Sequence, residues 1–178
     1  AIWDPAQERL LLARDRAGER PLFYAADETG VSFASEIASL VTALSRPLPR
    51  DIQGIRDYLQ RGYFGAPQSP FRSIRKVRPA EAVIFSRHTT EHRRYWRWNL
   101  PPAPRHRVDP QTFDNIFRHA VHRQSEVDVP YGVFLSGGVD SSLVAAVLRS
   151  LRPEFPLTAY TLRFHEPSFD EGSFAQQV

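Results

Sequence analysis

The 178-residue chain contains no cysteine and no methionine, and Lys76 is the one lysine among its 23 basic residues. Without cysteine, disulfides, thiolate metal sites and cysteine nucleophiles are excluded within these residues. No apolar run approaches the roughly twenty residues that a membrane span needs, and no signal-peptide pattern opens the chain. We therefore expect no membrane partner, and the lack of cysteine fits the cytoplasmic location that we predict.

The formal net charge is only +3, because the arginines are interspersed with acidic residues. This pattern argues against a nucleic-acid partner. Residues 93–98 alternate arginine with tyrosine and tryptophan, which we interpret as a strand with one buried face rather than a platform for stacking bases. The chain begins in a strand-like pattern and stops in a helix-like one, so we expect a fragment of a longer protein.

The order of hydrophobic patterns predicts two different parts. Residues 1–35 read as antiparallel strands with a hairpin turn at 27–30. They are followed by helices at 36–44, with Ser35 as N-cap, and at 51–60, and by strands at 82–85 and 93–98. Three prolines between positions 101 and 104 predict an extended connector. Beyond it, Asp109 is the predicted N-cap of a helix from Pro110 to about 124. This helix precedes a strand–helix–strand succession, which indicates a parallel α/β unit.

The stretch from Val133 to Ser142 carries the strongest chemical signal. A short apolar strand, 133–135, turns through Ser136-Gly137-Gly138 into a helix that runs to about 151, and the next strand is predicted at 157–164. Glycine lets the backbone bend and approach a ligand, while the free N–H groups and dipole of a helix start favour negative charge. The sequence therefore predicts an anion-binding loop.

Three common loop types do not fit these residues. A kinase-type phosphate loop requires a lysine that is absent here, a dinucleotide fingerprint requires three spaced glycines, and a nucleophile elbow requires glycine where Phe134 stands. The pattern Ser-Gly-Gly-x-Asp-Ser instead resembles the signature of the ATP pyrophosphatase (PP-loop) enzymes. In that reading the hydroxyls of Ser136, Ser141 and Ser142 and the backbone of residues 137–140 hold pyrophosphate oxygens, and Asp140 holds Mg²⁺.

Several further motifs resemble glutamine-hydrolysing asparagine synthetases, in the order of that family. They are residues 128–142, the Arg-Asp-x-x-Gly-x-Arg-Pro-Leu-Phe-Tyr stretch of residues 14–24, Phe-Ala-Ser-Glu-Ile at 33–37, Tyr95-Trp96 and Phe169-Asp170-Glu171. The resemblance implies the later part of an N-terminal-nucleophile glutaminase domain at 1–100 and the beginning of a PP-loop synthetase domain at 101–178. No catalytic residue is expected within the fragment, since the glutaminase cysteine would precede Ala1.

The resemblance implies a ligase of amino-acid biosynthesis. It would adenylate the side-chain carboxylate of aspartate with Mg²⁺ and ATP, and ammonia from glutamine would displace AMP to give asparagine. A homodimer is one assembly that we consider. The residues expected to bind the nucleotide are Leu135, Ser136, Gly137, Gly138, Val139, Asp140, Ser141, Ser142 and Leu162, with the two leucines at the adenosine and Asp140 at the metal.

Some positions depart from the family pattern. Pro79-Ala80-Glu81 stands where Pro-Gly-His is usual, Arg20 where lysine is common, and Val127 where serine is common. Two alternatives therefore stay open. One is a β-lactam or macrolactam synthetase with an inactive amidotransferase domain, acting on another carboxylate and amine. The other, which rests only on the incompleteness of the fragment, is a degenerate, non-catalytic binding or regulatory protein.

Overall fold

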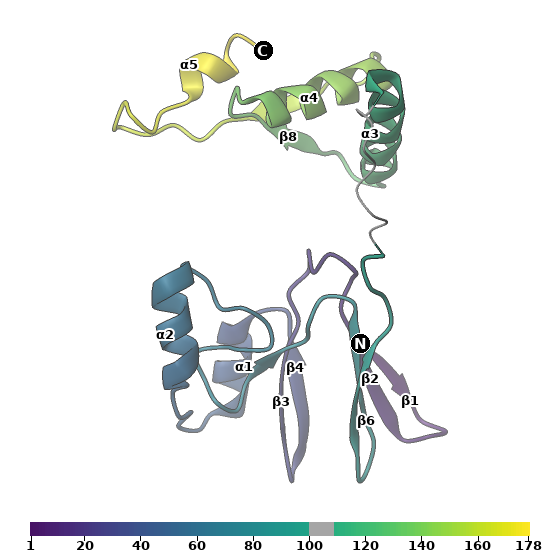
Figure 1. The fold of residues 1–178 in the computed structure, drawn as a ribbon, viewed down its shortest axis with the longest axis vertical. Helices are drawn as coiled ribbons and strands as arrows, with labels where there is room; N and C mark the ends of the chain where they lie inside the picture. The colour runs from purple at the N-terminus through teal and green to yellow at the C-terminus, as the bar shows by residue number, and fades with distance from the viewer. Residues whose placement is uncertain (100–108) are drawn as a thin grey trace. The chain divides into compact units, whose positions relative to one another are not determined.

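The computed structural model describes residues 1–99 and 109–178, whose contacts divide the chain into two compact units, Ala1–Pro101 and Pro102–Val178 (Figure 1). The predicted proline connector at 101–104 and the predicted domain boundary at 100/101 lie outside the described residues.

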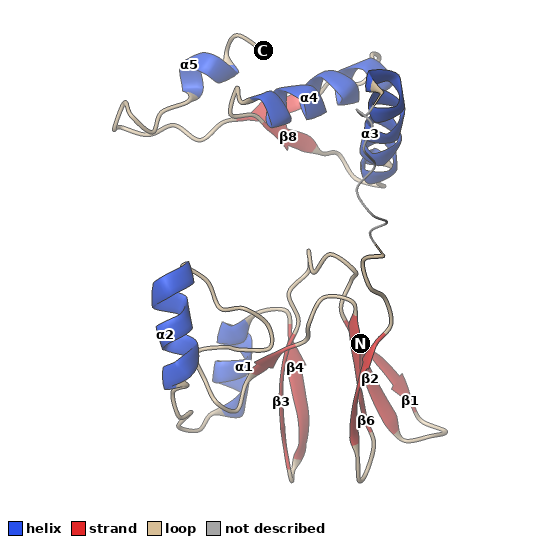
Figure 2. Ribbon diagram, in the orientation of Figure 1, coloured by secondary structure: helices blue, strands red, loops and turns tan. Residues whose placement is uncertain are grey.

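The first unit is built from two antiparallel sheets (Figure 2). The larger has the order β1-β2-β6-β7, formed by Ile2–Asp4, Arg9–Ala13, Glu81–Phe85 and Thr90–Arg94. The smaller has the order β4-β3-β5, formed by Gly30–Ala34, Phe23–Asp27 and Arg75–Lys76. The predicted turn at 27–30 joins β3 and β4, which pair from Phe23↔Ala34 to Asp27↔Gly30.

Alternate side chains of β3 enter two different cores, because successive residues of a strand point to opposite faces. Tyr24 joins Leu12, Val77, Val83 and Phe85 in a cluster between the two sheets, and its ring meets that of Phe85 edge-on at 5.3 Å. Phe23 and Ala25 instead pack with Leu40 and Ile74 beneath α1. The layers of this unit are therefore sheet, sheet and helix.

The two helices of this unit are α1 (Ile37–Leu44) and α2 (Ile52–Arg61), close to the predicted ranges. Asp51 caps α2 by accepting hydrogen bonds from the N–H groups of Gln53 and Gly54. The prediction that Ser35 caps α1 is wrong. Glu36 is the N-cap residue, without a side-chain capping bond, because the extended strand β4 runs to Ala34 and the helix starts at Ile37, one residue later than a Ser35 cap requires.

Strand β7 ends earlier than the predicted strand at 93–98. It occupies Thr90–Arg94, since the tight turn at Ser86–Thr89 starts the pairing with β6 at Phe85↔Thr90 and ends it at Glu81↔Arg94. Tyr95 adds one more backbone bond, to the carbonyl of Ala80 at 2.9 Å. Residues 96–98 then leave the sheet, so they do not form the buried strand face that we predicted.

The second unit contains α3 (Pro110–Ser125), β8 (Gly132–Phe134), α4 (Val139–Leu151), β9 (Thr158–Tyr160) and the short α5 (Gly172–Ala175). Asp109 caps α3 through the N–H groups of Gln111 and Thr112, with Pro110 at the first helical position, as predicted. Strands β8 and β9 are parallel and connected through α4. The strand predicted at 157–164 is shorter, because pairing with the three-residue β8 ends at Phe134↔Tyr160.

Across both units, the mixture of antiparallel sheets and helices with a parallel strand–helix–strand unit is the mixed α/β architecture that the sequence predicted. Within residues 1–99 and 109–178, no helix has the length and apolar character needed to cross a membrane.

Candidate functional site

The predicted anion loop joins the carboxyl end of β8 to the start of α4. Val133 and Leu135 are buried on one side of the chain, which fixes the end of the strand, and Val147 buries the inner face of the helix. Ligands of open parallel sheets bind at the carboxyl ends of the strands. The loop at residues 135–138 therefore lies where such a sheet binds its ligand.

Two serine hydroxyls hold this loop in shape. The Oγ atoms of Ser136 and Ser141 lie 2.9 Å apart, and the N–H of Ser136 donates to Ser141 Oγ at 3.2 Å. The N–H of Gly138 donates to Ser136 Oγ at 3.3 Å, while Ser141 Oγ donates to the carbonyl of Gly138 at 3.2 Å. Hydroxyls that we predicted to contact phosphate thus also close the loop on itself, which the spacing of the serines alone did not indicate.

The two glycines of the loop have different structural roles. Gly137 has a φ of +79°, and a Cβ placed on it would lie 2.5 to 2.6 Å from the backbone of Phe174 and Ala175. Only glycine accommodates both the left-handed backbone and the close approach of α5. Gly138 has an ordinary φ of −71° and is the N-cap of α4.

The start of α4 has backbone N–H groups that are not used by the hydrogen bonds of the helix. Its first helical bond runs from the N–H of Ser142 to the carbonyl of Gly138 at 3.0 Å, so the N–H groups of residues 139–141 precede the helical ladder. These groups and the helix dipole favour an anion. Val139 and Asp140 are exposed at this end of the helix.

Ser142 behaves differently from the other serines. Its Oγ is enclosed and makes no hydrogen bond within the described residues. In the arrangement that the structure records, its hydroxyl is therefore not presented to a ligand, although the sequence pattern predicts a phosphate donor at this position.

The two leucines predicted at the nucleotide differ in exposure. Leu135 is 8% exposed, and its backbone is bound on both sides: its N–H donates to the carbonyl of Tyr160 at 2.9 Å, and its carbonyl accepts from Thr161 Oγ1 at 2.8 Å. Leu162, which follows Thr161 in the chain, is 72% exposed. The structure thus brings the two positions close along the backbone, with the open apolar surface on Leu162.

An ion pair that sequence reasoning did not identify shapes the segment after β9. The guanidinium of Arg163 binds the carboxylate of Asp170 through two nitrogens, with Nε–Oδ1 and Nη2–Oδ2 distances of 2.8 Å. Hydrogen bonds from Arg163 hold the pKa of Asp170 below its usual value. Asp170 also accepts from the N–H of Gly172, at the start of α5.

This ion pair needs a glycine beside it. A Cβ on Gly172 would lie 2.2 Å from Nε of Arg163, so a side chain there would displace this guanidinium from its present position. The pair and the glycine together fix where α5 begins, and α5 is the helix whose backbone packs on Gly137. The sequence identified Asp170 and Glu171 only as part of the family-like motif at 169–171, because the separation of Arg163 and Asp170 along the chain carries no recognisable signal of an ion pair.

The site offers one carboxylate to a metal. No group of three or more histidine, aspartate and glutamate side chains in the described parts of the chain is arranged to hold a metal ion. Mg²⁺ is commonly held by one or two carboxylates together with substrate phosphates. The exposed Asp140, beside the donors of the helix start, fits that mode of binding.

Comparisons with known proteins agree with the resemblance. The family described as "Glutamine amidotransferase domain" matches residues 1–96, and the family described as "Asparagine synthase" matches residues 112–178. Asparagine synthetase [glutamine-hydrolyzing] 3 of Bacillus subtilis is 32% identical over 173 residues, which cover 93% of this chain and 28% of the relative.

Two other relatives extend the comparison. Asparagine synthetase [glutamine-hydrolyzing] 1 of Bacillus subtilis is 29% identical over 181 residues, and the protein named amidase chry2 of Gibberella zeae is 28% identical over 190 residues. Both alignments cover 99% of this chain and 28% of the relative, so the chain spans well under two thirds of these proteins. On the two matched families and these relatives, the chain belongs to the glutamine-hydrolysing asparagine synthetase family.

Proposed function

We propose that the chain forms part of an ATP-dependent, amide-forming ligase, with a partial glutaminase domain at 1–100 and the beginning of a synthetase domain at 101–178. The observation that carries this proposal is the loop at residues 135–142. It combines two glycines, a serine pair and the open N-terminus of α4 at the carboxyl end of a parallel strand.

In this proposal the loop holds the β- and γ-phosphates of ATP. The N–H groups at the start of α4 bind phosphate oxygens, while the hydroxyls of Ser136 and Ser141 exchange their mutual hydrogen bond for bonds to the ligand. Ser142 joins them only if its enclosed hydroxyl becomes exposed. Leu135 and Leu162 lie at the adenosine, with Leu162 supplying the exposed apolar contact.

Asp140 would hold the Mg²⁺ through its carboxylate. The ion would reduce the repulsion between Asp140 and the phosphates and stabilise the charge on the departing pyrophosphate. Binding the β- and γ-phosphates as one leaving group directs the attacking carboxylate oxygen to the α-phosphorus. The bond from the α-phosphorus to the bridging oxygen breaks, which gives an acyl-adenylate and pyrophosphate.

The second step forms the amide. Ammonia attacks the acyl carbon, AMP leaves with the carboxylate oxygen that had been adenylated, and the attacking nitrogen loses a proton. We propose aspartate as the carboxylate and glutamine as the source of ammonia. The departures at Ala80 and Glu81 lie in the first unit, so they leave the adenylation loop unchanged.

The test uses the full-length protein and measures ATP–pyrophosphate exchange that depends on an added carboxylate. Asp140→Ala should abolish this exchange and leave glutamine hydrolysis intact. Glu154→Ala is the matched control, because Glu154 is an exposed carboxylate beyond the other end of α4 and should not affect exchange. Normal exchange in Asp140→Ala would contradict the role of Asp140.

The same assay separates the alternatives. Exchange with aspartate, followed by asparagine formation from glutamine, supports the asparagine synthetase activity. Exchange with a different carboxylate and no glutamine hydrolysis would indicate a lactam-forming relative, and binding of ATP without any exchange would indicate a non-catalytic protein.

A further inference from the structure

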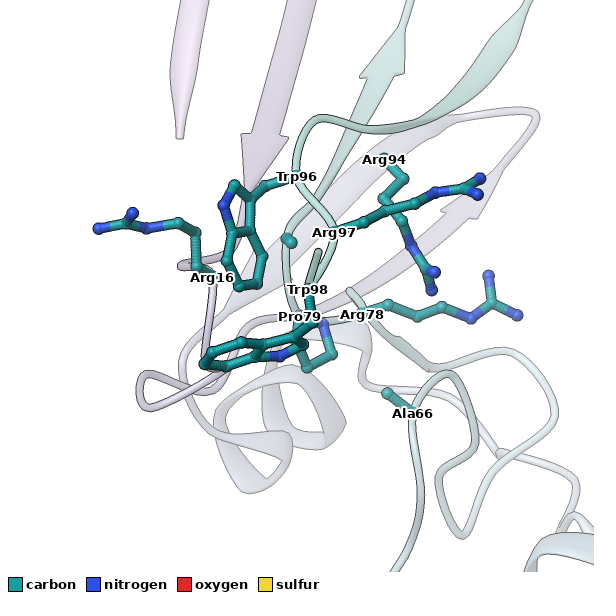
Figure 3. A pocket seen from close by; sticks show the side chains of 9 residues that line it. Arg16, Ala66, Arg78, Pro79, Arg94, Trp96, Arg97 and Trp98 are labelled. Carbon is teal, nitrogen blue, oxygen red and sulfur yellow. The ribbon is translucent and has the colours of Figure 1, made fainter. Parts of the chain in front are cut away.

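A cleft within the first unit gathers arginine and tryptophan side chains that the proposed ligase reaction does not use. It has a volume of about 630 Å³ and brings together segments that are far apart in the sequence (Figure 3). Its principal side chains are Arg16, Arg78, Arg94, Trp96, Arg97 and Trp98. This volume is in the range of pockets that take small molecules.

Backbone bonds fix the walls of this cleft. The N–H of Ala80 donates to the carbonyl of Asp15 at 3.0 Å, and the N–H of Tyr95 donates to the carbonyl of Ala80 at 2.9 Å. These two bonds join the segment that carries Arg16 and the segment that carries Trp96 to the turn between them. The cleft is thus formed by three anchored segments rather than by one loose loop.

Arg14 and Gly18 tighten the same region. The guanidinium of Arg14 donates to the carbonyls of Gly18, Arg20 and Val77, at 2.6 to 3.0 Å. A Cβ on Gly18, whose φ is +75°, would lie 2.7 Å from Cγ of Pro79. The 14–20 loop therefore packs directly against Pro79, which lines the cleft, and the charge of Arg14 adds to the positive potential there.

The arginines of the cleft are poorly neutralised. Arg78 lies 3.4 Å from the buried carboxylate of Glu81, whereas Arg16, Arg94 and Arg97 form no ion pair with any described residue. Figure 3 shows the guanidinium groups of Arg78, Arg94 and Arg97 on the same side of the cleft. Clustered guanidinium groups that lack acidic partners favour a multiply charged anion, and their forked geometry suits phosphate.

Two of the three tryptophans of the chain line the same cleft. The rings of Trp96 and Trp98 meet edge to face with their centres 4.7 Å apart, and the guanidinium of Arg16 lies 5.8 Å from the Trp96 ring centre. Trp98 remains 71% exposed. A large aromatic ring that packs on a second indole and is left open to solvent is suited to stack on a planar ring of a ligand.

We propose that this cleft binds a nucleotide, with its base stacked on Trp98 and its phosphates held by Arg78, Arg94 and Arg97. Simple phosphate would use the arginines but not the exposed indole, and an uncharged heterocycle would use the indole but not the arginines. None of its residues belongs to the loop at residues 135–142, so it would be a second nucleotide site in addition to the proposed ligase centre.

Photolabelling of the full-length protein with azido-adenosine monophosphate, followed by mapping of the labelled peptides, tests this proposal. Label on the peptides that contain Trp96 or Trp98, competed by unlabelled AMP, is the expected result. Label confined to peptides of residues 132–142 would overturn the second site while leaving the proposed ligase site supported. Absence of label from the Trp96 and Trp98 peptides would overturn the second site whether or not residues 132–142 are labelled. It would not contradict the proposed ligase loop, because AMP lacks the β- and γ-phosphates that this loop is proposed to hold.

Variants then test the two halves of the cleft. The double variant Arg94→Ala and Arg97→Ala should weaken AMP binding at this site by about tenfold or more, as expected for loss of charge-assisted bonds to phosphate. Trp98→Leu should reduce the labelling while leaving the fold intact, since this side chain is mostly exposed. The matched controls, Arg56→Ala and Trp3→Leu, change exposed residues that do not line the cleft and should have no effect.

Two outcomes would overturn the proposal even if label appears at the cleft. One is unchanged labelling in Trp98→Leu, which would remove the stacking role. The other is displacement of the label by single-stranded RNA under conditions in which AMP fails to displace it, because the cleft would then be part of a nucleic-acid surface.

Discussion

The adjacent glycines at 137 and 138 allow a direct test of how the loop is held. Gly137→Ala places a methyl group in a left-handed backbone and 2.5 Å from the backbone of Phe174. The left-handed conformation costs an L residue about 1–2 kcal/mol. Overpacking against fixed backbone typically adds about 1–3 kcal/mol. The expected loss of stability is therefore about 2–5 kcal/mol, unless α5 moves away from the loop.

Gly138→Ala is the matched control one residue further along. Its φ of −71° is open to any L residue, and the nearest atom to a new Cβ is the side-chain oxygen of Ser136 at 3.3 Å. The reduced freedom of the unfolded chain and this tight contact act in opposite directions, so we expect a change within about 1 kcal/mol of zero. Both variants remove a glycine from the same motif, and only the first also opposes α5.

The assay is chemical denaturation of the full-length protein together with hydrogen exchange of the amides in the second unit. In Gly137→Ala, exchange should increase in α5 and in the loop at 135–138, and the transition of this unit should move to lower denaturant concentration. In Gly138→Ala both should stay near the wild type. Equal destabilisation by the two substitutions would refute the reasoning, because it would show that the contact between Gly137 and α5 does not govern the loop.

Two predictions concern the first unit. Burial acts to raise the pKa of Glu81, but the N–H of Arg78, the ring of His92 and the charge of Arg78 hold it below its usual value. Stability from the ionised carboxylate is thus present above about pH 4.3 and lost as pH falls through the lowered pKa. Glu81→Gln should lower stability at neutral pH by about 1–3 kcal/mol and remove this acid dependence from urea denaturation curves; a persisting dependence would assign it to another group. Asp51→Ala should destabilise α2 by about 1 kcal/mol while Asp51→Asn, which keeps the capping oxygen, should not, and equal melting temperatures for the two would contradict the capping role.

Periodicity and turn chemistry predicted most of the elements, because these signals are local. Asp109-Pro110 marked the start of α3, and the turn at 27–30 marked a hairpin. Ser35 was wrong as a cap, since β4 runs to the residue just before it and α1 starts only at Ile37. The extent of β7 also depends on its partner β6, and no pattern within residues 93–98 reports where that pairing ends.

In the candidate site, too, the sequence predicted the local features but not the contacts between distant residues. The turn from strand to helix at Ser136–Gly138 follows from adjacent residues, and the structure has it where the sequence indicates. The packing of α5 on Gly137 and the ion pair of Arg163 with Asp170 join residues that are separated along the chain. Glycines 137 and 172 mark both contacts, but a single sequence does not distinguish a glycine needed for close approach from one needed for a turn.

Arg14 has a consequence for the order in which the first unit folds. Its guanidinium joins the nearby carbonyls of Gly18 and Arg20 to that of Val77, which is 63 residues away in the chain. Such a contact forms only after a long stretch of chain has been brought together, which makes it slow relative to local structure. The hairpin of β3 and β4 can form early from neighbouring residues, whereas the 14–20 loop reaches its final shape only when the segment before β6 arrives. The walls of the arginine and tryptophan cleft are therefore assembled late. In a refolding experiment, the fluorescence of Trp96 and Trp98 should change after the hairpin has formed.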